Sequence, residues 1–139
     1  MTEIILANRA TNTNSKRAEF YDKAGEAGIA INQDAYASST DRVYDLEKYP
    51  DAFSIVLKNT HGSNGTTYKI DSTREESVTG LFDDVAWDAE VAEANLASGA
   101  KITALELLRL FGTKKALRLQ VKRQTSAQDS SLKLFVTAK

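Results

Sequence analysis

The sequence contains no cysteine, and only one proline, one histidine, one tryptophan and one methionine occur among its 139 residues. Without cysteine, disulfide bonds and thiolate metal sites are excluded. No apolar run approaches the roughly 20 residues that cross a membrane. The N-terminus also lacks the basic start and long apolar core of a secretory signal. We therefore expect no membrane partner, and a location in the cytoplasm or in a particle such as a virion.

The rest of the composition is typical of a folded globular protein. Hydrophobic residues make up 42% and charged residues 27% of the chain, both ordinary fractions. A chain of this length corresponds to one domain and can bury roughly two-thirds of the surface that its unfolded form exposes. We expect residues 1–139 to form a single domain with one core.

The charges are distributed unevenly along the chain, although the net charge is only −1. Residues 1–100 contain 9 Lys/Arg and 17 Asp/Glu, a net of −8, whereas residues 101–139 contain 9 Lys/Arg and 2 Asp/Glu, a net of +7. Such asymmetry often marks an interaction surface. It permits three interpretations: a basic patch for nucleic acid, head-to-tail association of acidic and basic faces, or mutual neutralisation within one fold.

Alternating apolar and polar residues predict several strands. We expect strands at 2–7, 29–31, 53–58, 66–71, 78–82, 117–121 and 132–136. The turn-forming residues 59–65 predict a hairpin between two of these strands, and the polar residues 125–130 predict a second, C-terminal hairpin.

Three segments have the start and stop signals of helices. Asn14 or Ser15 can cap a helix over 16–27, and Asp83 or Asp84 can cap another that ends at Gly99. The sequence from Thr103 to Glu106 matches a capping box and predicts a helix over 103–111. The expected fold class is therefore α+β, with a small, mainly antiparallel sheet, about three helices and a C-terminal β-hairpin.

Two patterns could carry chemistry, but each has a simpler interpretation. His61 lies in a glycine-containing loop with Ser63, which a hydrolase could use as base and nucleophile; the loop more simply forms a solvated hairpin tip. Asp84 and Asp88 would share a face of the expected helix and could bind Mg²⁺, although helix capping accounts for the same residues. We predict no catalytic residue, no metal site and no cofactor.

The basic C-terminal third is the strongest functional signal. We expect one basic interaction face formed by Lys114, Lys115, Arg118, Lys122, Arg123 and Lys133. A largely apolar segment at 104–111 argues against a DNA-reading helix. The leading hypothesis is a non-enzymatic structural or assembly subunit, for example of a phage or virus particle, that acts through self-association or contacts with other protein subunits. The alternative is a nucleic-acid-binding accessory protein that uses the basic face.

Overall fold

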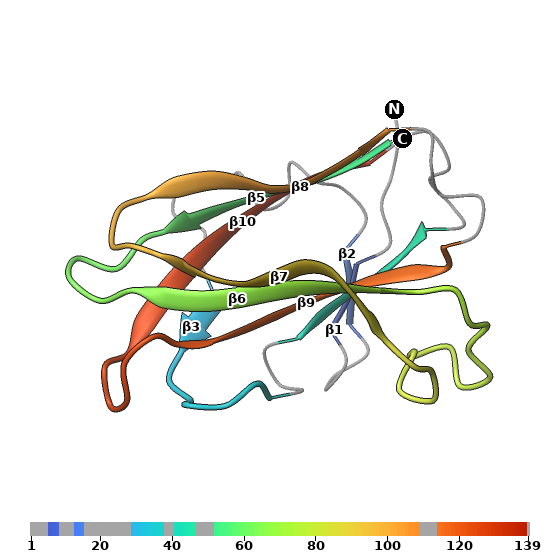
Figure 1. The fold of residues 1–139 in the computed structure, drawn as a ribbon, viewed down its shortest axis with the longest axis horizontal. Helices are drawn as coiled ribbons and strands as arrows, with labels where there is room; N and C mark the ends of the chain where they lie inside the picture. Colours follow the sequence, from blue (N-terminus) through green and yellow to red (C-terminus); the bar gives the residue numbers. More distant parts are fainter. Residues whose placement is uncertain are drawn as a thin grey trace.

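The computed structural model describes residues 6–8, 13–15, 29–37, 41–46, 52–108 and 114–138. These residues form ten β-strands and no α-helix (Figure 1). The strands are β1 (Leu6–Asn8), β2 (Thr13–Ser15), β3 (Ile29–Ile31), β4 (Arg42–Asp45), β5 (Ala52–Asn59), β6 (Thr66–Thr73), β7 (Asp88–Leu96), β8 (Lys101–Leu108), β9 (Ala116–Arg123) and β10 (Ser130–Ala138). No described residue belongs to a helix that could cross a membrane.

The strands form two antiparallel sheets. One sheet has six strands in the order β2-β1-β4-β9-β6-β7, and the other has four in the order β3-β10-β5-β8. The two sheets face each other in Figure 1, so that the described residues form a β-sandwich. The expected α+β fold is therefore wrong.

The core lies between the sheets and follows directly from the alternation in the sequence. In β5, Phe53, Ile55 and Leu57 are buried, whereas the residues between them are more exposed. The facing strand β9 buries Leu117 and Leu119. The Tyr44 and Phe53 rings pack edge to face across the core, with 5.1 Å between their centroids. A half-buried strand needs this period of two, because successive side chains point to opposite faces of a sheet.

Two of the expected helices are strands instead. The segment predicted to be helical from Asp84 to Gly99 contains β7, and the segment 103–111 overlaps β8. Alanine, leucine and glutamate favour helix locally, but pairing of β7 with β6 and of β8 with β5 overrides this preference. The expected helix over 16–27 lies outside the described residues. The expected strand at 78–82 is part of the irregular connection between β6 and β7.

Both expected hairpins are also wrong, although their strands are present. The strands predicted at 117–121 and 132–136 correspond to β9 and β10, which lie in different sheets: β9 pairs with β4 and β6, and β10 pairs with β3 and β5. In the same way, β5 and β6 are consecutive in sequence but lie in opposite sheets. The turns that follow β5 and β9 therefore cross between the layers of the sandwich rather than closing hairpins.

Candidate functional site

The structure brings five of the six predicted basic residues together. Lys114 and Lys115 immediately precede β9, and Arg118, Lys122 and Arg123 lie on it. Lys133 lies on β10 in the other sheet. The expected single basic face is thus divided between the two sheets, because β9 and β10 do not form a hairpin.

Each of the five residues on or beside β9 contacts a carboxylate of this chain. Arg118 lies 2.6 Å from Asp71, and Arg123 lies 2.8 Å from Asp34 and 2.9 Å from Asp129. The other ion pairs are Lys114–Glu90, Lys115–Glu76 and Lys122–Glu93. Apart from Arg123–Asp129, these contacts join the basic C-terminal third to the acidic residues 1–100, as the neutralisation hypothesis expects.

The Arg118–Asp71 pair differs from the others because it is largely shielded from water. The two side chains are 14% and 7% exposed. The Trp87 ring covers the guanidinium at 4.5 Å, a cation–π arrangement. Phe82 lies beside Trp87, with 6.5 Å between the ring centroids. The aromatic pair thus packs over an ion pair at the surface of the six-stranded sheet.

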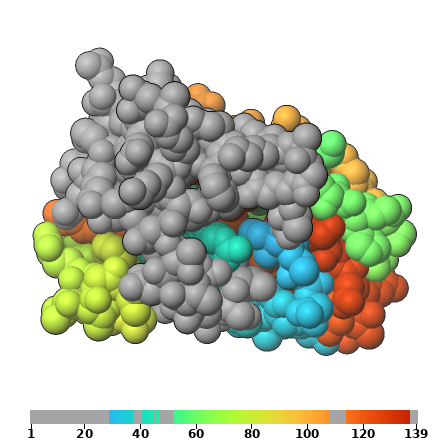
Figure 2. Space-filling view, turned by 180° about the vertical axis from the view of Figure 1, so that it is seen from behind, coloured from blue at the N-terminus to red at the C-terminus, as the bar shows by residue number. Residues whose placement is uncertain are grey.

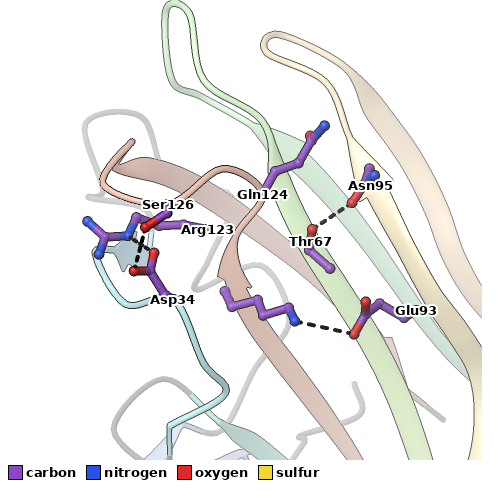
Figure 3. A pocket seen from close by; sticks show the side chains of 8 residues that line it. Asp34, Thr67, Glu93, Asn95, Arg123, Gln124 and Ser126 are labelled. Carbon is purple, nitrogen blue, oxygen red and sulfur yellow. Dashed lines mark hydrogen bonds and ion pairs between the residues drawn. The ribbon is translucent and has the colours of Figure 1, made fainter.

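Next to these ion pairs is an open polar depression of about 350 Å³ (Figure 3). Its lining comes from the β3–β4 connection, β6, β7, the end of β9 and the β9–β10 connection. The lining residues are Asp34, Thr67, Glu93, Asn95, Lys122, Arg123, Gln124 and Ser126. Figure 3 shows that most of these side chains are already bonded to one another, as in the Thr67–Asn95 hydrogen bond of 2.6 Å. The depression offers donors and acceptors to a polar ligand or protein surface.

Hydrogen bonds around this depression shift the pKa of two carboxyl groups. The Ser126 hydroxyl, followed by the Arg123 guanidinium, lowers the pKa of Asp34. The Tyr36 hydroxyl donates to Glu93 and lowers its pKa, with a further contribution from Lys122. Burial and the bond to Glu93 raise the pKa of Tyr36. Since the carboxyl pKa values are lowered, both groups stabilise the fold above their ordinary pKa and lose this effect as the pH falls through the lowered values.

The bond between Tyr36 and Glu93 can be tested directly. In Tyr36→Phe, we expect the pKa of Glu93 to rise toward its ordinary value, because its largest stabilising contact is lost. Carbon-detected NMR titration of the carboxyl groups measures this. The pKa of Asp34, which is set by Ser126 and Arg123, serves as the internal control. An unchanged pKa of Glu93 would contradict the assigned contact.

The two patterns considered for chemistry have structural roles in the described residues. Nδ1 of His61 accepts hydrogen bonds from the backbone N–H groups of Ser63 and Asn64, at 3.1 and 3.0 Å, and so shapes the turn after β5. Asp84 accepts from the Ser77 hydroxyl and the Val78 N–H, both at 2.7 Å, and so organises the β6–β7 connection. Within the described segments, no three His, Asp or Glu side chains converge as metal ligands.

Sequence reasoning missed Tyr36 and Asp34, which lie in the connection between β3 and β4. Tyr36 lies over both Lys69 and Lys122, with the ammonium nitrogens 5.0 and 4.9 Å from its ring centroid. The sequence places these residues in an irregular polar segment, far from their partners. Only the strand order brings them to β6 and β9.

No family model and no curated protein matches the chain. Among solved structures, it is similar to xylanase 10B of Clostridium thermocellum, whose structure contains CBM22-1 and GH10 modules with xylohexaose (14% identity, TM-score 0.45, 99% of this chain and 25% of that chain). It is also similar to a xylan-binding domain from CBM 22 (12% identity, TM-score 0.37, 82% and 83% of the two chains). A third similar structure is xylanase 10C of Cellvibrio japonicus in complex with xylopentaose (13% identity, TM-score 0.36, 98% of this chain and 27% of that chain). The chain spans about a quarter of the first and third proteins.

The class that the described structure defines is an antiparallel β-sandwich with a charge-paired polar face on its six-stranded sheet.

Proposed function

We propose that this chain is a non-enzymatic structural subunit that acts through contacts with further copies of itself or with other protein subunits. A phage or virus particle is the setting that we favour, with the chain located in the cytoplasm of a host cell or in the virion. The observation that carries this proposal is the edge strand β8 of the four-stranded sheet, which pairs on one side only among the described residues.

Both sheets end in a long edge strand on the same side of the sandwich. Within the described residues, β7 pairs only with β6, and β8 pairs only with β5. A short turn joins β7 to β8, and Gly99 in this turn has a φ of 75°, a conformation that glycine adopts without steric penalty. An edge strand offers unpaired backbone N–H and C=O groups to a strand of another subunit.

The two edges differ in how well they are protected against such pairing. β7 carries Asp88, Glu90 and Glu93, and its register with β6 shifts twice. Charged side chains and bulges are the features that prevent edge-to-edge association. β8 has one register shift and carries two charged residues, Lys101 and Glu106, and its Ile102 side chain is 41% exposed. We therefore propose β8 as the edge that pairs with a neighbouring subunit.

The alternative, a nucleic-acid-binding accessory protein, would use the basic residues on and beside β9. Each of these cations contacts a carboxylate of the same chain. Phosphate groups would have to displace those carboxylates, and fewer counterions would be released on binding. The charge pairing therefore favours protein contacts over nucleic-acid binding by this face.

Size-exclusion chromatography with light scattering tests the assembly proposal. We expect a mass above the 15.2 kDa of one chain that increases with protein concentration. In Ile102→Lys, we expect the association to weaken at least tenfold, because a charge on an edge strand opposes pairing. Ala92→Lys, at an exposed position of β7, is the matched control and should associate as the unmodified chain does. A mass of 15.2 kDa at all concentrations would overturn the proposal.

A further inference from the structure

Three lysines form a row across the outer face of the four-stranded sheet. Lys58 of β5 lies directly opposite Lys133 of β10 on one side and opposite Lys101 of β8 on the other. The sequence neighbours of Lys58 and Lys133, which are Leu57, Leu132 and Leu134, are buried between the sheets. Since successive side chains alternate between faces, Lys58 and Lys133 belong to the outer face, and Lys101 shares this face because it pairs directly with Lys58.

This row is electrostatically unfavourable in the isolated subunit. Like charges directly opposite each other on neighbouring strands destabilise a sheet. Lys101 and Lys133 lie over the Phe135 ring, at 4.8 and 5.5 Å from its centroid, and this contact holds both side chains on the face. Lys58 and Lys101 contact no carboxylate within 4.0 Å among the described residues. Lys58 and Lys101 thus differ from the cations of β9, which carboxylates of the same chain neutralise.

Beside the lysine row is an apolar strip on the same face. Phe135 lies opposite Val56, which in turn lies opposite Thr103. Phe135 and Val56 are both half-buried. The face therefore combines cations with a small apolar surface, and a partner must supply anions together with an apolar group.

The connection between β6 and β7 has this complementary chemistry. Residues 74–88 contain one arginine and five acids, a net charge of −4. Four of the acids, Glu75, Glu76, Asp83 and Asp84, are exposed in the loop, and the Val78 side chain at its surface is 94% exposed. An exposed valine within an acidic loop matches an apolar strip beside a lysine row.

The loop and the lysine row lie toward opposite ends of the molecule. Lys58 and Lys101 are at the ends of β5 and β8 that border the turns 60–65 and 97–100. Figure 1 shows these turns at the left end of the molecule and the β6–β7 loop at the right end. In Figure 2, which is seen from behind, the loop lies at the left end, away from the turns. The loop of one subunit can therefore reach the lysine row only on another subunit.

We propose that the 74–88 loop of one copy docks on the face formed by Lys58, Lys101, Lys133, Val56 and Phe135 of a second copy. This inference rests on the proposed function and specifies its contact. The two surfaces are different, so the contact is heterologous, and it produces a ring or an open filament rather than an isologous dimer. Attraction between the loop and the lysines sets the direction in which copies join.

Neutralising the lysine row tests the contact. We expect K58Q/K101Q to lower the association constant at least tenfold at low salt, measured by light scattering. The variant Asn32→Glu/Ala35→Glu changes the net charge by the same amount at exposed positions between β3 and β4, and it should associate within twofold of the unmodified chain. If both variants associate equally, net charge rather than the lysine row controls assembly, and the proposed contact is wrong.

A charge-exchange experiment tests the docking contact most directly. K58E/K101E and E76K/D88K should each self-associate at least tenfold more weakly than the unmodified chain, and their mixture should associate more tightly than either variant alone, because each variant retains a surface that fits the other. Failure of the mixture to associate, while the unmodified chain still assembles, would overturn the docking contact and leave the proposed function standing. A monomeric unmodified chain would overturn both.

The same variants separate protein docking from nucleic-acid binding. Fluorescence anisotropy with a labelled single-stranded oligonucleotide at low salt should show no more than a twofold difference between the unmodified chain and K58Q/K101Q. Tight binding that K58Q/K101Q abolishes, with self-association unaffected, would assign the lysine row to nucleic acid and overturn the proposal.

Discussion

Leu119→Ala is expected to lower the free energy of unfolding by about 3 kcal/mol, the middle of the range for buried leucines. Leu119 is fully buried in β9, which pairs with β4 on one side and β6 on the other. Neighbours held by two sheets cannot collapse easily into the space that the truncation leaves. Urea unfolding measures the loss, and the melting temperature should fall by about 10 °C.

Ile102→Ala is the matched control for this truncation. Its side chain is 41% exposed on the edge strand β8. The same kind of truncation should cost about 1 kcal/mol or less there, because less apolar surface is lost from the interior. Equal costs at the two positions would show that Leu119 does not lie between two packed sheets.

Arg118→Met is expected to destabilise the protein by about 3 kcal/mol, because it leaves the largely buried Asp71 carboxylate without its closest cation. Lys69, at 3.8 Å from Asp71, replaces only part of this interaction. The methionine retains an apolar stem beneath Trp87, so packing is largely preserved. The measurement is again the free energy of unfolding in urea at neutral pH.

The double variant Arg118→Met/Asp71→Val separates charge from packing. Removing both charges should restore most of the stability, since the penalty of Arg118→Met comes from an unpaired carboxylate. Lys115→Met is the control, because its partner Glu76 has a 79% exposed side chain and such pairs contribute at most about 1 kcal/mol. Losses that simply add in the double variant would contradict the assigned coupling.

The sequence predicted the strands that have one buried face. The segments 53–58, 66–71, 117–121 and 132–136 alternate, and all are strands in the structure, as is the short apolar segment 29–31. Their alternation comes from burial against the opposite sheet, so it is visible in the sequence of each segment alone. What alternation cannot specify is the partner of each strand. Consecutive strands that cross between two sheets have the same pattern as a hairpin, and both predicted hairpins failed for this reason.

The edge strands β7 and β8 were missed because their side chains are less buried and their sequences have stronger local helix signals. Most residues of β7 between Asp88 and Ala94 are only partly buried or exposed, and alanine and glutamate favour helix. The apparent capping box from Thr103 to Glu106 lies within β8. Backbone pairing with β5 and β6 decides the conformation of both segments, and this information is distant in sequence.

The candidate site was predictable only in part. Five of the predicted cations lie on and beside β9, because they are close together in the chain. It could not place Lys133 on the other sheet, nor bring Lys58 and Lys101 beside it, because those contacts depend on the register of β5 with its two neighbours. Likewise, apart from Asp129 beside Arg123, the carboxylates that neutralise the cations on and beside β9 come from segments 24 to 89 residues away in the sequence.

Hydrogen–deuterium exchange at two protein concentrations tests the central claim most directly. The account predicts that amides of residues 101–108 and of the 74–88 loop become more protected at high concentration, because β8 pairs and the loop docks when copies associate. The β7 amides from 89 to 96 should exchange at the same rate in both samples. Protection that does not change with concentration, or that increases only in β7, would contradict the account.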